Sequence, residues 1–79
     1  MLFPNKLFTY RESVISKFPI ALQLLQEGPM TVGDLYKALH THLSGVSEFM
    51  DLMDCLYALN KIRFDEEEGV LCYAKGNSL

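Results

Sequence analysis

The stretch Val46–Asn60, VSEFMDLMDCLYALN, has the most apolar helical pattern in the chain. Five of its side chains recur at the spacing of one helical face: Phe49, Leu52, Met53, Leu56 and Leu59. The remaining polar stripe is narrow and acidic, and consists of Glu48, Asp51 and Asp54. A helix with such a wide apolar surface must be covered from more than one direction, either by the rest of the chain or by a second protein.

A change of period follows this helix. Asn60 suits the left-handed backbone at a helix end. After it, Ile62 and Phe64 alternate with polar residues, which indicates a strand. Residues 66–69 read Glu-Glu-Glu-Gly and predict a turn, and residues 70–73 form a second apolar run. The sequence therefore predicts a β-hairpin directly after the central helix.

The residues before the central stretch predict two shorter helices. The first carries a capping-box pattern at residues 9–12, Thr-Tyr-Arg-Glu, and an apolar face made by Val14, Phe18, Leu22 and Leu25. Pro19 falls inside it, so we expect a kink or a restart near Phe18. Residues 28–29, Gly-Pro, end this element.

The second helix has the clearest local start in the chain. Thr31 is the expected N-cap, with Asp34 at the third helical position. Its predicted buried face consists of Val32, Leu35, Tyr36 and Leu39, and Leu43 would extend it. His40 and His42 lie at its end, where imidazole suits the helix dipole and solvent. Ser44 or Ser47 would cap the central helix.

Pro4 disfavours a helix at the start of the chain, so residues 1–8 are expected to form an extended N-terminal arm. This arm packs on the core or docks on a partner. Residues 9–74 then form one domain, and residues 75–79 form a polar tail. Three helices followed by a two-stranded hairpin are typical of a winged helix-turn-helix. The fold class is mainly α with a small β-hairpin.

Composition narrows the functional classes. The chain has 79 residues, 49% of them apolar, and a net charge of −3, which argues against a basic surface for nucleic acid. No apolar run is long enough to cross a bilayer, and the first residues, MLFPNK, lack the pattern of a secretory leader. We therefore expect a cytoplasmic protein. Cys55 and Cys72 have no partner at metal-ligand spacing and are expected to be free, although a disulfide between them stays open.

Many winged helices bind DNA, but the acidic residues of the predicted third helix and wing turn argue against DNA binding here. The third helix would present Glu48, Asp51 and Asp54 to the major groove, where readout needs Arg, Lys, Asn or Gln. The predicted wing turn is also acidic. No nucleophile with a base, no phosphate loop and no metal spacing is present, so we expect neither catalysis nor a cofactor.

The apolar side chains exceed what one small core can cover. If the surplus is exposed together, it forms a patch that signals association, and acids beside it suit a basic partner. The predicted partner-binding residues come from the arm, the third helix and the last strand: Leu2, Phe3, Met50, Asp51, Asp54, Tyr57, Leu71 and Tyr73. Completion of a monomeric core is the competing interpretation.

Three segments carry a resemblance to a known family. Residues 2–6 (LFPNK), 35–39 (LYKAL) and 56–73 (LYALNKIRFDEEEGVLCY) resemble the small middle component of bacterial ABC-three-component systems. The resemblance implies a winged-helix adaptor without catalytic activity, encoded beside an ABC or SMC-like ATPase and an effector-type third component. It also implies a role in conflict systems, including defence against phages. It assigns no residue roles.

The residues and the resemblance agree on a protein-interaction subunit that binds an ABC/SMC-like ATPase, an effector, or both. Two alternatives stay open. The first is a transcriptional regulator that binds DNA as a dimer. The second is a structural module that associates with itself, for example as a homodimer.

Overall fold

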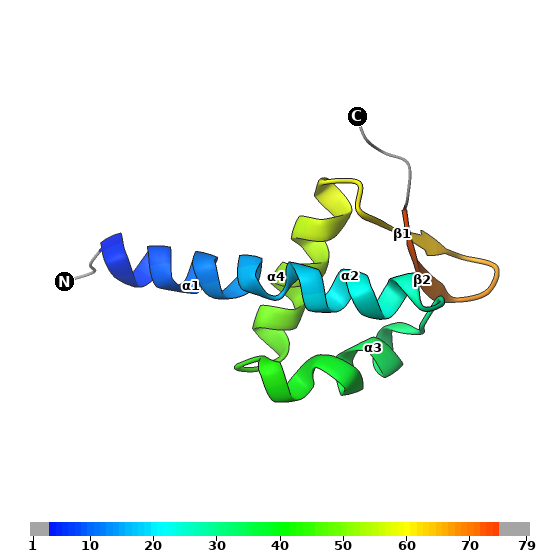
Figure 1. The fold of residues 1–79 in the computed structure, drawn as a ribbon, viewed down its shortest axis with the longest axis horizontal. Helices are drawn as coiled ribbons and strands as arrows, with labels where there is room; N and C mark the ends of the chain where they lie inside the picture. Colours follow the sequence, from blue (N-terminus) through cyan, green and yellow to red (C-terminus); the bar gives the residue numbers. More distant parts are fainter. Residues whose placement is uncertain (1–3, 75–79) are drawn as a thin grey trace.

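The structure, a computed structural model, describes residues 4–74, and it describes side chains from Thr9 onward. The described chain forms α-helices, one short 3-10 turn and two strands, in this order: α1 (Pro4–Ser16), α2 (Phe18–Gln26), α3 (Val32–Leu39), η1 (His40–His42), α4 (Val46–Ala58), β1 (Ile62–Asp65) and β2 (Val70–Tyr73). α1 and α2 lie nearly in line, α4 crosses them, and the hairpin lies at the far end of α2 (Figure 1). α1 packs on α4, whereas α2 packs on α3 and β2.

The predicted fold class is confirmed. The described residues are mainly helical with a two-stranded antiparallel hairpin, and this arrangement is compatible with a small winged-helix-like fold. α1 and α2 together take the place of the predicted first helix, α3 that of the second, and α4 that of the third. The predicted hairpin strands match the bounds of β1 and β2.

The break between α1 and α2 occurs where the sequence predicted a restart. Lys17 separates the helices, and its N–H donates to the Val14 carbonyl at 3.1 Å. Pro19 is then the second residue of α2. Proline is tolerated in the first turn of a helix because the N–H groups there have no intrahelical acceptor. The proline therefore starts a new helix instead of disrupting an old one.

The predicted extended arm is wrong for residues 4–8, which belong to α1. Pro4 is the first residue of that helix, a position that proline favours because its fixed φ is already helical and its missing N–H is not needed. The capping-box pattern at residues 9–12 consequently lies inside α1 and does not start it. Leu2, Phe3 and the predicted tail at residues 75–79 lie outside the described residues.

The N-cap of α3 is confirmed, because the Thr31 hydroxyl accepts a hydrogen bond from the Asp34 N–H at 3.1 Å. Two details of this helix differ from the prediction. Val32, its first residue, is 44% exposed and not buried. Leu43 follows the turn η1 instead of extending the helix, and His40 and His42 in that turn are exposed, as expected.

The core lies where α3 and α4 face α2. Its largest fully buried side chains are Leu35, Leu39, Leu52 and Leu56. Tyr36 meets the Phe49 ring edge-on, with ring centroids 5.1 Å apart. Leu59 was predicted for the same face but is 55% exposed. α4 ends at Ala58, and the following turn, in which Asn60 adopts a φ of 60° as expected, directs Leu59 away from the core.

The hairpin is tied to the helices by a contact that the sequence did not reveal. Met30, between α2 and α3, forms an antiparallel bridge with Leu71 through two backbone hydrogen bonds of 3.1 and 2.7 Å. Leu71 lies opposite Phe64 and so shares a face with Ile62, which is buried. This face covers the core. Leu71 is therefore only 7% exposed, contrary to the exposure that its predicted partner-binding role requires.

Leu56 and Leu59 offer a direct test of the boundary of the core. We expect Leu56→Ala to lower the free energy of unfolding by about 2–5 kcal/mol, because it leaves a cavity at a fully buried site. Leu59→Ala should cost less than about 1 kcal/mol, because that side chain is already half in water. Urea denaturation of both variants measures the difference; equal losses would place Leu59 in the core.

Candidate functional site

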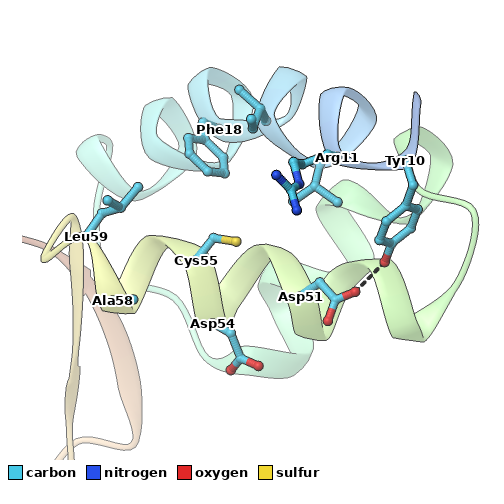
Figure 2. Close-up of a pocket in the computed structure, with 10 residues that line it drawn as sticks. Tyr10, Arg11, Phe18, Asp51, Asp54, Cys55, Ala58 and Leu59 are labelled. Carbon is cyan, nitrogen blue, oxygen red and sulfur yellow. Dashed lines mark hydrogen bonds between the residues drawn. The ribbon is translucent and has the colours of Figure 1, made fainter. Parts of the chain in front are cut away.

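A groove of about 650 Å³ runs between the α1–α2 line and α4 (Figure 2). One wall comes from α1 and the first residue of α2, and the other from α4 and the residue after it. Its lining is mostly apolar and consists of Tyr10, Arg11, Val14, Ile15, Phe18, Asp51, Asp54, Cys55, Ala58 and Leu59. This volume lies in the range of binding pockets, so the groove is the candidate site.

Apolar side chains from both walls meet along the groove. Val14 and Phe18 are four residues apart across the helix break and therefore face the same side. On α4, Cys55 and Ala58 recur at helical spacing on the opposite wall. Ile15 and Leu59 are 51% and 55% exposed, so the apolar strip is open to solvent at these two residues.

Polar groups gather at the end of the groove that lies toward the N-terminus of α1. The Tyr10 hydroxyl donates a short hydrogen bond to the Asp51 Oδ2, which joins the two walls (Figure 2). This hydrogen bond raises the pKa of Tyr10 from 10.0 to about 12, so the phenol remains a hydrogen-bond donor at mildly alkaline pH as well as at neutral pH. Arg11 lies near this end and makes no ion pair with another described residue, whereas Asp54 lies one helical turn farther along α4 (Figure 2).

Glu48, predicted to be on the exposed acidic stripe, is instead buried and only 2% exposed. Its Oε2 accepts hydrogen bonds from the Ser13 hydroxyl at 2.7 Å and the Lys17 ammonium at 3.1 Å. Its Oε1 accepts from the Ser44 N–H at 2.8 Å. Ser13 and Lys17 belong to the α1 side, whereas Ser44 precedes α4. One carboxylate therefore ties three segments of the chain together.

The partners of Glu48 also explain its ionisation. The Ser44 N–H, followed by Ser13 and Lys17, lowers the pKa of Glu48 to about 2, although burial acts in the opposite direction. Lys17 is a close counter-ion, with a side chain only 14% exposed. Gly45, the N-cap of α4, offers no side chain for capping, so the expected serine cap is wrong. The Glu48 carboxylate, at the third helical position, reaches back instead.

The other chemistry-bearing groups of the described chain stand apart. Cys55 and Cys72 are both free thiols, as expected. Within residues 4–74, no three His, Cys, Asp or Glu side chains are arranged to hold a metal ion. None of the helices in this part of the chain has the length and apolar character that a bilayer span needs.

The structure brings only part of the predicted partner-binding set together. Asp51 and Asp54 line the groove. Met50 and Tyr57 are 55% and 63% exposed on α4, outside the groove lining. Tyr73 is half-buried, and Leu71 lies in the core. Leu2 and Phe3 lie outside the described residues.

Sequence reasoning missed the α1 wall. Ile15 directly follows a core residue, Val14, and no periodic pattern marks it as functional. Tyr10 and Arg11 were read as part of a helix start. A helix drawn from Pro4 onward would place Tyr10, Val14 and Phe18 at intervals of four residues on one side. This four-residue spacing is the sequence pattern from which the α1 wall of the groove could have been predicted.

A small helical module with a hairpin wing and an open apolar groove is the class of protein that these features define. Comparison with known families matches residues 3–71 to the family described as ABC-three component (ABC-3C) system Middle Component 7. Because the match covers most of the 79 residues, the chain belongs to this family. No significant match was found among curated proteins or solved structures. Membership of a multi-component system implies protein partners.

The buried carboxylate predicts a specific pH dependence. Because the pKa of Glu48 is lowered to about 2 from its usual 4.5, its stabilisation is complete above the higher value and is lost as the pH falls toward the lower one. Glu48→Gln should destabilise the protein by roughly 1–3 kcal/mol at neutral pH, since Lys17 loses its counter-ion. It should also flatten the dependence of unfolding free energy on pH between about pH 5 and pH 2.

Glu66→Gln, at an exposed position in the wing turn, is the matched control and should change neither quantity appreciably. Chemical denaturation over this pH range checks both variants. A Glu48→Gln protein with the unaltered stability and the unaltered pH profile would show that the carboxylate does not hold the helices together.

Proposed function

We propose that this middle component is a non-catalytic adaptor, which binds the ABC/SMC-like ATPase of its system, the effector component, or both. The observation that carries the proposal is the open groove between α1 and α4, where Ile15 and Leu59 leave about half of their surface in solvent. An apolar strip of this kind on a small domain favours association with another protein. We further propose that the assembly works in the cytoplasm, in conflict with invading genetic elements such as phages.

The charges around α4 support a protein partner over DNA. In winged helices that read DNA, the third helix enters the major groove. The exposed side of α4 instead carries Met50, Asp51, Asp54 and Tyr57, which offer no cation to phosphate. The wing turn adds an acidic run, in which Asp65 accepts hydrogen bonds from the Glu67 and Glu68 N–H groups. These acids would repel a duplex from both contact elements.

The proposed absence of catalysis is consistent with how the acidic groups are engaged. Glu48 is held by three hydrogen-bond partners and keeps a low pKa, which is the opposite of what a general acid needs. Asp51 is held by Tyr10. Both carboxylates thus serve to position helices.

Co-expression with the other components of the same system tests the adaptor role. A tagged chain should co-purify with the ABC ATPase or with the third component. Met50 and Tyr57 lie one helical turn from the groove residue Asp54, on the exposed side of α4. Met50→Asp and Tyr57→Asp should therefore weaken this capture while leaving the free energy of unfolding within about 0.5 kcal/mol, because both side chains are mostly in solvent. Val32→Asp, at an exposed apolar site on α3, is the control.

A monodisperse monomer that captures neither component would contradict the proposal. The alternative function, a transcriptional regulator that binds DNA, is tested by a mobility-shift assay at low salt on DNA from the protein's own promoter. Even nonspecific DNA binding would appear under these conditions. We expect no shift.

A further inference from the structure

The groove has the dimensions of a helix-binding site. Its α4 wall extends from Asp51 to Leu59, which corresponds to about 12 Å at the rise of an α-helix. This length accommodates roughly two turns of a partner helix. Helices that bind such grooves insert apolar anchors at intervals of three and four residues. Ile15 and Phe18 on the opposite wall provide a matching apolar surface, whereas Val14 is only 4% exposed.

The charges on the two walls indicate which kind of helix fits. The α4 wall carries Asp51 and Asp54, and the Asp54 carboxylate points away from the α1–α2 side (Figure 2). Among the described side chains, the α1 wall carries Arg11 as its cation. Tyr10 is neutral at physiological pH, and its hydroxyl donates to Asp51. The groove is therefore acidic along one side. A second copy of this acidic chain would bring like charges together, whereas a helix edged with Lys or Arg would complement them.

We propose that the groove between α1 and α4 binds an amphipathic helix of a partner subunit of the same system. The apolar face of that helix lies on Ile15, Phe18 and Leu59, and its Lys or Arg side chains lie beside Asp51 and Asp54. Arg11, on the other wall, makes the charge pattern of the described side chains asymmetric, so that one orientation of the bound helix is favoured. This inference rests on the proposed adaptor function and names the site and the chemistry of the partner.

The groove is held open before a partner arrives. The Glu48 carboxylate joins α1 to the start of α4 through Ser13, Lys17 and Ser44, and Tyr10 joins the two walls at one end. Fixed walls reduce the ordering cost of association, so binding energy is not spent on forming the site.

Two groove variants test the proposal in the co-expressed system. Ile15→Asp places a charge on the apolar strip and should weaken capture of the partner subunit by at least about tenfold. Asp54→Lys reverses the charge of one wall and should also weaken it, by several-fold, and make the residual binding less sensitive to salt. Both side chains are exposed, so folding should be retained, as thermal unfolding will show.

Matched controls lie away from the groove. Val32→Asp changes an apolar residue of similar exposure on α3, and Glu66→Lys makes the same charge reversal in the wing turn. Both should capture the partner within about twofold of the unaltered chain. If Glu66→Lys weakens capture as much as Asp54→Lys does, total charge and not the groove attracts the partner, and the proposal is overturned.

Cys55 supplies a reporter that needs no mutation. It is a half-buried free thiol in the groove, whereas Cys72 is a buried free thiol in the hairpin. Formation of the complex should slow alkylation of Cys55 by N-ethylmaleimide and leave Cys72 unchanged. A photo-crosslinking residue in place of Ile15 should then label a segment of the partner that is apolar on one face and carries Lys or Arg beside it.

The outcomes separate this inference from the function on which it rests. If the unaltered chain captures neither component, the adaptor function fails and the groove assignment with it. If capture is normal but survives both groove variants, with Cys55 unprotected, only the groove assignment is wrong. A dimer of this chain that depends on Ile15, or a small molecule that protects Cys55 with no partner present, would also overturn it.

Discussion

The arrangement of the helices depends on one buried carboxylate. Glu48 draws hydrogen bonds from α1, from the break after α1 and from the backbone before α4. A buried acid is costly unless it is paired and hydrogen-bonded, and this one is both. Val14 lies between Ser13 and Lys17 and is itself a core residue that lines the groove. The same segment of the chain therefore supplies hydrogen bonds to Glu48 and forms part of the groove wall, so a change that moved one would also move the other.

The sequence predicted those parts of the fold in which local chemistry and tertiary packing agree. The N-cap at Thr31, the helix end at Asn60 and both hairpin strands follow from short-range rules and are present. The burial of Glu48 could not be predicted in this way, because two of its three partners, Lys17 and Ser13, lie 31 and 35 residues away in the sequence. The pairing of Met30 with Leu71 is equally remote. Pro4 was misread because proline both ends helices and begins them.

The position of α4 within the fold shows why architecture alone does not assign function. A winged-helix-like arrangement exposes one side of its third helix, here α4, and the residues on that side determine which class of partner can bind. Here the exposed surface combines acids with Met50 and Tyr57, and the adjoining groove is apolar. The same scaffold with lysines at these positions would suit nucleic acid. Membership of a multi-component family agrees with the surface that is present.

The bridge at Met30 has a consequence for how the sheet ends. β2 is paired on one side by β1 and on the other by Met30, so β1 forms the outer edge of the hairpin. That strand has only four residues, and two of them, Arg63 and Asp65, are charged. Short charged edges resist the addition of further strands. The exposed edge of the hairpin is thus protected against edge-to-edge association between copies of the chain.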